Sequence, residues 1–109
     1  MNKIIYQGPF KDHIRNHVEL KRAVGYKYNT EAHHLKRFDR FTFEKHPNTK
    51  VLTKGIVSDW CSKKAYETDA NRSSRASVIR QFGVYLDSIG VAAYILPKGY
   101  YPKGKQYIP

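Results

Sequence analysis

Residues 69–90 read DANRSSRASVIRQFGVYLDSIG, a stretch with the pattern of one long amphipathic helix. Its apolar side chains recur at the i, i+3, i+4, i+7 spacing that places them on one helix face. They are Val78, Ile79, Phe82, Leu86 and Ile89, with Tyr85 at the edge of the stripe and Ser77 and Arg80 on the opposite side. Gly90 follows where a left-handed residue commonly ends a helix. The stretch therefore predicts a helix that packs this stripe into a core.

The first turns of the same stretch are polar and carry two arginines. The residues are Asn71, Arg72, Ser73, Ser74 and Arg75. Because Arg, Asn and Ser are the residue types that reach phosphates and base edges, we expect this cluster to contact DNA rather than only solvent. Both arginines precede the apolar stripe, so the fold is expected to survive their replacement by alanine.

Two further helices are predicted at the start of the chain. The first covers residues 9–24, with Gly25 as its stop, and its stripe is Phe10, Ile14, Val18 and Val24, with His17 in the same sector. The second covers residues 31–45, with Thr30 as its N-cap. Its inward side chains are Leu35, Phe38 and Thr42, with Phe41 on one flank. Its other side is basic and carries His33, Lys36, Arg37 and Arg40, with almost no acidic partner, so we favour a binding face there over a solvated one.

A shorter helix is predicted over residues 54–65, capped by Thr53 and packed through Ile56, Val57 and Trp60. The chain's one cysteine, Cys61, lies in this helix beside Trp60 and is expected to be a small buried hydrophobe. Residues 91–109 are rich in Pro, Gly, Tyr and Lys and contain no acidic residue, so no regular element is expected there. We therefore divide the chain into a helical domain, residues 1–96, and a linker, residues 97–109.

The composition points to an anionic partner. The chain has 109 residues and a formal net charge of +11, an imbalance that costs a small protein some self-repulsion. No apolar run is long enough to span a membrane, and residues 1–10 do not contain the long apolar segment of a signal peptide, so we expect a nucleic acid in the cytoplasm as the partner and not a membrane.

No pattern in the sequence predicts catalysis, a metal or a cofactor. His13 and His17 have the i, i+4 spacing of a helical metal pair, but no third ligand is placed and no Glu follows His13. The carboxylates are scattered, and no phosphate-binding glycine pattern occurs. We expect a binding protein and not an enzyme.

Several segments together resemble the core-binding domain of tyrosine recombinases, the phage integrase family. They are the interval from Gly25 to Thr30 followed by Leu35, Phe38 and Phe41, the segment LTKGIVSDW at residues 52–60, and RASVIRQFGVYLDSIG at residues 75–90. Each motif is diffuse, but their order and spacing cover nearly the whole chain. The resemblance implies an all-α, compact four-helix orthogonal bundle of the SAM-like type with an extended C-terminal linker.

The same resemblance implies a role on duplex DNA. In that family this domain and a catalytic domain clamp the duplex, with the second and fourth helices turned toward the grooves. The positions that would face DNA are Thr30, His33, Arg37, Arg40, Asn71, Arg72, Ser73, Arg75, Ser77 and Arg80, with Lys27 and Tyr28 as backbone contacts. The catalytic Arg, Lys, His and nucleophilic Tyr would belong to a domain after Pro109, so no tyrosine of this chain is expected to act as a nucleophile. The partners implied are double-stranded DNA and the catalytic domain of the same recombinase, with oligomers forming on DNA through the full-length protein.

Two departures and two alternatives stand beside this interpretation. Gly83 should weaken its helix by about 1 kcal/mol relative to Ala unless a close helix contact offsets it. We also expect no N-terminal arm-binding domain of the family, since only a few residues precede the first helix. The chain is expected to be a fragment or truncated form of a phage or mobile-element integrase.

One alternative function is that of a small RNA-binding or ribosome-associated protein that uses Lys98, Lys103 and Lys105 with the neighbouring tyrosines on single strands. The other is an interaction module for an acidic protein.

Overall fold

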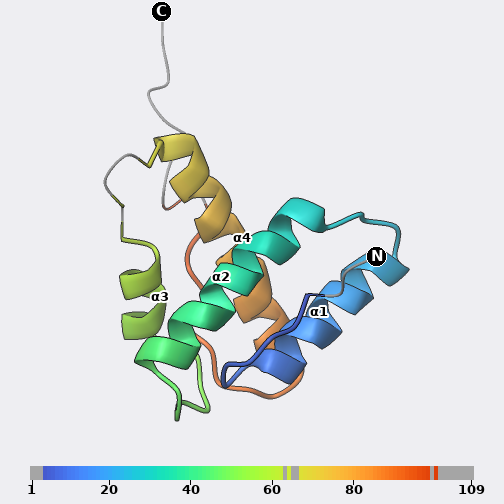
Figure 1. Cartoon of the computed structure of the whole chain (residues 1–109), viewed down its shortest axis with the longest axis horizontal. Helices are drawn as coiled ribbons and strands as arrows, with labels where there is room; N and C mark the ends of the chain where they lie inside the picture. Colours follow the sequence, from blue (N-terminus) through green and yellow to red (C-terminus); the bar gives the residue numbers. More distant parts are fainter. Residues whose placement is uncertain (1–3, 63, 65–66, 99, 101–109) are drawn as a thin grey trace, which may run out of the picture.

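The computed structural model describes residues 4–62, 64, 67–98 and 100, and this part of the chain forms four α-helices and no strand (Figure 1). The helices are α1 (Lys11–Ala23), α2 (Asn29–Lys45), α3 (Lys54–Trp60) and α4 (Asp69–Ser88). The prediction of a compact all-α fold is confirmed. In Figure 1, α2 crosses in front of α4, with α1 on one side and α3 on the other. Within the described residues no helix is long and apolar enough to cross a membrane.

One aromatic side chain from each helix region meets at the centre of the core. Phe10, the N-cap residue of α1, stacks on Phe38 of α2 with ring centres 6.1 Å apart, and Phe82 of α4 lies edge-on 6.0 Å from Phe10. Trp60, the last residue of α3, approaches Phe38 edge-on at 5.2 Å. Such ring pairs add about 0.5–1.5 kcal/mol each beyond their burial, so these four rings tie the helices together.

Two residues assigned to the apolar stripes lie on the surface instead. Val24 is 64% exposed and Ile89 is 45% exposed. Both are C-cap residues, after which the chain turns away through glycines with positive φ, Gly25 and Gly90, as predicted. Val24 is also six residues from Val18, which places it well off the helical stripe.

The helix starts follow the predictions at α3 but not at α2. Thr53 caps α3, its Oγ1 accepting a hydrogen bond from the Ile56 N–H at 3.1 Å. The predicted Thr30 cap is wrong, because α2 already begins at Asn29. Its N-cap is Tyr28 in the left-handed region at φ 57°, with no side-chain cap. α3 is also shorter than predicted and ends at Trp60.

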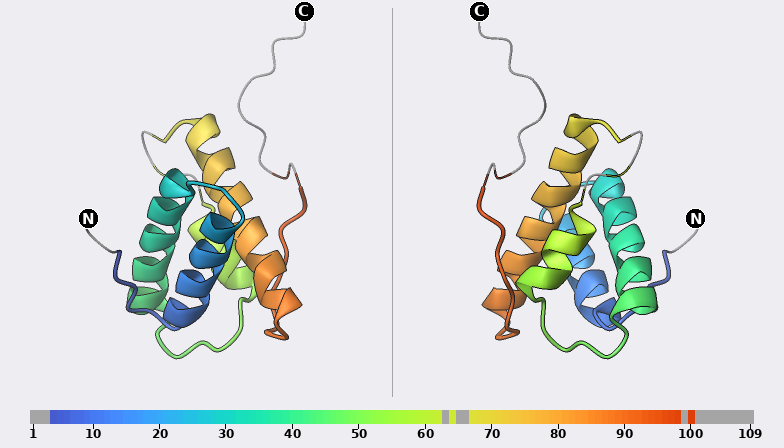
Figure 2. Two further views of the ribbon diagram at one scale, coloured as in Figure 1. Left: turned by 90° about the vertical axis from the view of Figure 1, so that its right-hand side faces the viewer. Right: turned by 90° about the vertical axis from the view of Figure 1, so that its left-hand side faces the viewer.

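Gly83 is explained by a close contact with the segment that follows α4. This segment returns along the outer side of α4, as the side views of Figure 2 show. A Cβ at Gly83 would lie 3.2 Å from the Tyr94 carbonyl oxygen. Tyr94 N–H donates in turn to the Leu52 carbonyl at 2.7 Å, and Leu96 is buried. The contact that offsets the cost of Gly83 is therefore made with a non-helical segment. From the sequence we expected a contact with a helix.

A buried aspartate joins the N-terminal segment to α2. The carboxylate of Asp39 accepts hydrogen bonds from the N–H groups of Gln7 and Gly8, both at 2.8 Å. Gly8 is packed so closely that a Cβ there would lie 2.7 Å from the Asp39 carbonyl oxygen. Asp39 lies in phase with the inward side chains Leu35 and Thr42. That register was the signal of a buried role.

Candidate nucleic-acid interface

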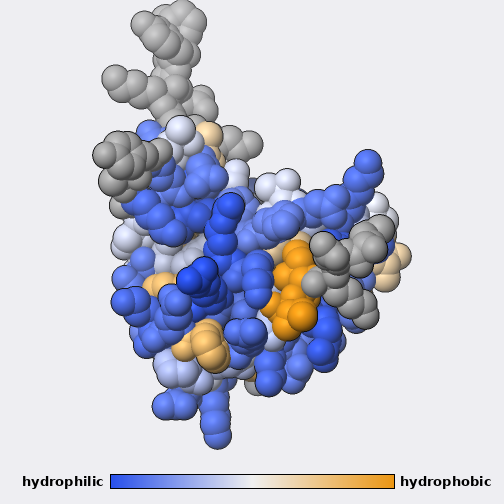
Figure 3. All heavy atoms as spheres, in the orientation of Figure 1, coloured by the Kyte–Doolittle hydropathy of each residue, from blue (hydrophilic) through white to orange (hydrophobic). Residues whose placement is uncertain are grey.

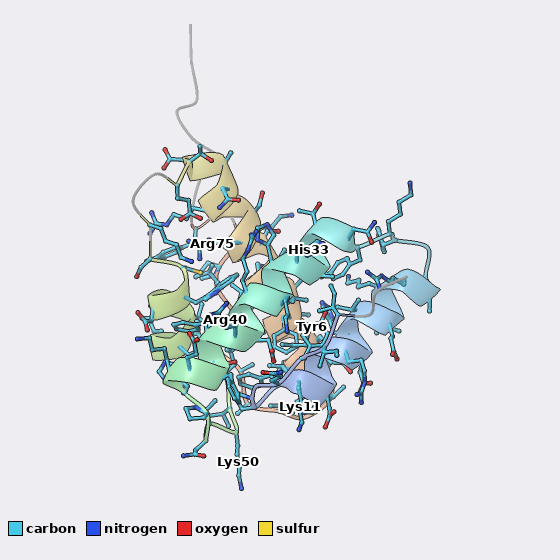
Figure 4. All side chains as sticks on the ribbon, viewed as in Figure 1. Tyr6, Lys11, His33, Arg40, Lys50 and Arg75 are labelled. Carbon is cyan, nitrogen blue, oxygen red and sulfur yellow. The ribbon has the colours of Figure 1, made fainter. Side chains whose placement is uncertain are left out.

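The outer face of α2 carries a row of basic side chains opposite its buried stripe. Leu35, Phe38, Asp39 and Thr42 are buried, which leaves the opposite side of the helix facing outward. The outward residues are His33, Lys36, Arg37 and Arg40, which we call the α2 basic row. Figure 4 shows His33 and Arg40 along the same side of α2, and no other helix covers that side in Figures 1 and 2. All but the half-buried Lys36 are exposed.

The members of the α2 basic row differ in how firmly they are held. Lys36 Nζ donates to the Ile5 carbonyl of the N-terminal segment. Arg40 pairs with Glu44 at 3.3 Å, but both side chains are largely exposed, and such surface pairs contribute about 0–1 kcal/mol. Neither His33 nor Arg37 makes a side-chain hydrogen bond or ion pair with the described residues. Arg37 is therefore the residue in this row best able to contact an anion without losing a partner.

Arg75, in contrast, is not available to DNA, so its prediction as a contact is wrong. The residue is only 2% exposed. Its Nε and Nη2 each donate to one carboxylate oxygen of Glu67 at 2.7 Å. Nη1 donates to the Trp60 carbonyl and Nη2 to the Ser62 carbonyl at 3.2 Å, while the guanidinium lies 4.9 Å from the centre of the Trp60 ring. Because of these contacts, we now expect replacement of Arg75 to destabilise the fold.

Arg72 belongs to the same arrangement. It is half-buried, and its Nε donates to the Cys61 carbonyl at 2.9 Å. The carbonyls of Trp60, Cys61 and Ser62 at the end of α3 thus all receive arginine donors from α4. A helix C-terminus leaves carbonyls without intrahelical partners and favours positive charge, so both arginines act as a cap for α3.

Glu67 completes this arrangement, which we call the α3 cap: Arg72, Arg75 and Glu67. The hydrogen bonds from Arg75 are the main cause that lowers the pKa of Glu67 to about 2. The Glu67 carboxylate also accepts from Asn71 Nδ2 at 2.6 Å and from the Lys64 N–H at 3.2 Å. Asn71, predicted to contact DNA, is therefore held by Glu67 although it is exposed.

The other residues of α4 that were predicted to contact DNA carry less positive charge than the α2 basic row. Ser77 is exposed, whereas Ser73 and Arg80 are half-buried. Arg80 Nε is buried without a hydrogen-bond partner among the described residues. Arg80 is thus the basic residue of α4 that remains after Arg72 and Arg75 are assigned to the α3 cap.

Tyr28 is also in the interior, which contradicts its prediction as a backbone contact. It is 5% exposed, and its hydroxyl lies 3.0 Å from His17 Nε2 and donates to Gln81 Oε1 at 3.2 Å. Burial raises the pKa of Tyr28 and, together with Lys21, lowers the pKa of His17 to about 4. This network joins α1, the start of α2 and α4. Lys27, the other residue predicted to contact the DNA backbone, is exposed, and so is Thr30, predicted to face DNA.

Cys61 and His17 fit structural roles. Cys61 is buried, and burial raises the pKa of its thiol to about 11, which keeps it protonated and unreactive near neutral pH. His17 Nε2 lies within hydrogen-bonding distance of the Tyr28 hydroxyl, which gives this member of the i, i+4 pair a contact in the core. Among the described residues, no three His, Cys, Asp or Glu side chains are grouped to hold a metal ion.

A groove of about 800 Å³ borders the N-terminal end of the α2 basic row. It lies between the N-terminal segment, α1 and the turn that leads into α2. Its lining consists of Ile4, Tyr6, Arg15, Val18, Glu19, Arg22, Tyr26, Lys27, Asn29 and His33. Figure 3 shows an apolar area between α1 and α2 on a mostly hydrophilic face, and Figure 4 places Tyr6 in the same region.

No protein-family model matches this chain, and neither a curated protein nor a solved structure is significantly similar to it. The likeness to the core-binding domain of tyrosine recombinases therefore stays a prediction that rests on the residues quoted for it. The evidence for a function comes from the geometry of the surface.

Proposed function

We propose that this chain binds duplex DNA through the α2 basic row. The observation that carries this proposal is the row itself: Arg37, Arg40 and His33 project from an uncovered helix face of a chain with a net charge of +11. Arginine donors suit phosphate oxygens, and neutralising phosphates releases counterions from the duplex. Binding through such a row is strong at low salt and weak in sequence preference.

The contribution of α4 to this interface is smaller than the sequence predicted. Ser77, with Arg80 and Ser73 beside it, can supply contacts to phosphates, while Arg72 and Arg75 hold the α3 cap. We infer that the DNA lies mainly along α2, with Lys27 and Thr30 near one end of the row. A place as the core-binding part of a phage or mobile-element recombinase, with the catalytic domain elsewhere in a longer protein, is consistent with this arrangement.

The test is a salt titration of duplex binding, measured by fluorescence anisotropy. Each phosphate contact contributes a slope of about 0.9 in log affinity against log salt. The Arg37→Ala and Arg40→Ala variants should each weaken binding at low salt and lower this slope by about one. Lys50→Ala is the matched control, because it removes one exposed charge from the connector before α3, at a distance from Arg40 in Figure 4.

Two results would contradict the proposal. Equal losses in Arg37→Ala and Lys50→Ala would mean that net charge alone drives binding and that the α2 basic row has no special role. Tighter binding of single-stranded RNA than of duplex DNA, measured by competition with the same labelled duplex, would favour the RNA-binding alternative.

A further inference from the structure

We propose that the groove beside the α2 basic row binds one unpaired nucleotide of the nucleic acid that lies on α2. The inference rests on the proposed function and adds a second, separable site to it. His33 belongs both to the α2 basic row and to the groove lining, and Lys27 lines the groove at the start of α2. A strand that follows the row would therefore reach the groove without leaving the surface.

The size and lining of the groove suit a base with its phosphate. Its volume of about 800 Å³ is within the range of pockets that hold small organic ligands, about 300–1,000 Å³. Two tyrosine rings line it, and Tyr26 is 61% exposed. Lys21 Nζ lies 5.6 Å from the centre of the Tyr26 ring. A base that stacks on an exposed ring gains affinity with little regard to sequence, because every base has a flat face.

The charge of the groove suits a phosphate. Three cationic side chains, Arg15, Arg22 and Lys27, line it together with one carboxylate, Glu19. Arg15 pairs with Asp12 at 3.2 Å in an exposed bridge that contributes little to stability. Lys27 Nζ has no hydrogen-bond or ion-pair partner among the described residues, so it is the cation that can meet a phosphate at the least cost.

Arg22 has a structural role, because it holds the turn that forms one side of the groove. Its Nε donates to the Lys27 carbonyl at 3.0 Å and its Nη2 to Asn29 Oδ1 at 3.3 Å. These bonds hold the turn between α1 and α2 that carries Tyr26 and Lys27. The turn is therefore positioned before any ligand arrives, which reduces the ordering cost of binding.

The experiment compares two duplexes that are identical except for one unpaired 2-aminopurine nucleotide at one end. We expect the overhang to increase the affinity of the wild-type chain about tenfold, with fluorescence quenching as the base stacks on tyrosine. Tyr26→Ala should remove both the added affinity and the quenching but leave blunt-duplex affinity within twofold. Tyr26→Phe should keep both effects, because it keeps the ring.

Tyr100→Ala is the matched control, since Tyr100 is an exposed tyrosine outside the groove lining. This substitution should change neither the affinity for the two duplexes nor the quenching. Equal affinity of the wild-type chain for the blunt and overhanging duplexes would overturn the groove site, as would unchanged quenching in Tyr26→Ala. The proposed function is judged separately, by blunt-duplex binding and its loss in Arg37→Ala. If the blunt duplex does not bind, the groove is tested with a single-stranded oligonucleotide that carries 2-aminopurine. Quenching with the wild-type chain and its loss in Tyr26→Ala would support a nucleotide site in the groove, and no quenching would overturn it.

Discussion

The arginines of α2 and those at the start of α4 look alike in the sequence but differ in the structure, where the first are exposed and the second hold the end of α3. Arg37 and Arg40 stand on an uncovered helix face, whereas Arg75 is buried and Arg72 half-buried against the end of α3. The difference lies in what is nearby: α4 begins beside carbonyls that lack helical partners, and the outer face of α2 does not. A cluster of Arg, Asn and Ser at a helix start can therefore indicate a structural cap as well as a binding face.

The largest effect that sharpens this comparison is expected from Arg75→Ala. Removing one partner of a buried ion pair leaves the other charged and unpaired, which costs about 3–5 kcal/mol. The Trp60 and Ser62 carbonyls also lose their donors, so the free energy of unfolding, measured by urea denaturation, should fall by at least this amount. Arg75→Lys should recover little, because an ammonium cannot make the two parallel bonds to Glu67.

Arg37→Ala is the matched control for this measurement, because it removes the same side chain from an exposed position and should change stability by no more than about 0.5 kcal/mol. An Arg75→Ala variant that is as stable as the wild type but binds DNA poorly would reverse the comparison. It would return Arg75 to the interface.

The next-largest expected effect is a loss of folding stability at acidic pH. Because the pKa of Glu67 is lowered to about 2, its ionised form stabilises the folded state fully above its ordinary pKa of 4.5, and this contribution is lost as the pH falls from 4.5 toward 2. The contribution is about 3 kcal/mol at neutral pH. Urea denaturation across pH should show Glu67→Gln much less stable than the wild type at pH 6, with the gap closing below pH 4.5. A gap that stays constant with pH would show that Glu67 acts by packing and not by its charge.

The smallest effect tests whether α4 is covered on its outer side as well. Alanine in place of a helical glycine usually stabilises, but at Gly83 the new Cβ would lie 3.2 Å from the Tyr94 carbonyl oxygen and displace the returning segment. We expect a net loss of about 1 kcal/mol in thermal or urea denaturation. Gly55→Ala in α3 is the control, since its Cβ would meet no atom closer than 3.8 Å, and it should stabilise slightly. A stabilising Gly83→Ala would mean that the segment does not press on α4.

The local features of the fold could be predicted because they depend on neighbours in the chain. The apolar periodicity located all four helices, Thr53 was identified as a cap, and Gly25 and Gly90 as stops, since only nearby backbone groups decide these features. The basic face of α2 followed from the same periodicity, because the inward stripe dictates what faces out.

The features that only the tertiary structure decided all involve groups distant in sequence. Arg75 turned inward because the end of α3 lies beside it, Asp39 was buried because the N-terminal segment crosses it, and Gly83 was needed because residues 94–95 return to it. The groove likewise joins residues from the N-terminal segment, α1 and α2. A polar side chain has no fixed direction until it has a partner, and the partner's position is set by how the helices pack. The sequence by itself therefore determined the helices and the net charge of this protein, while packing decided which of its charges face outward.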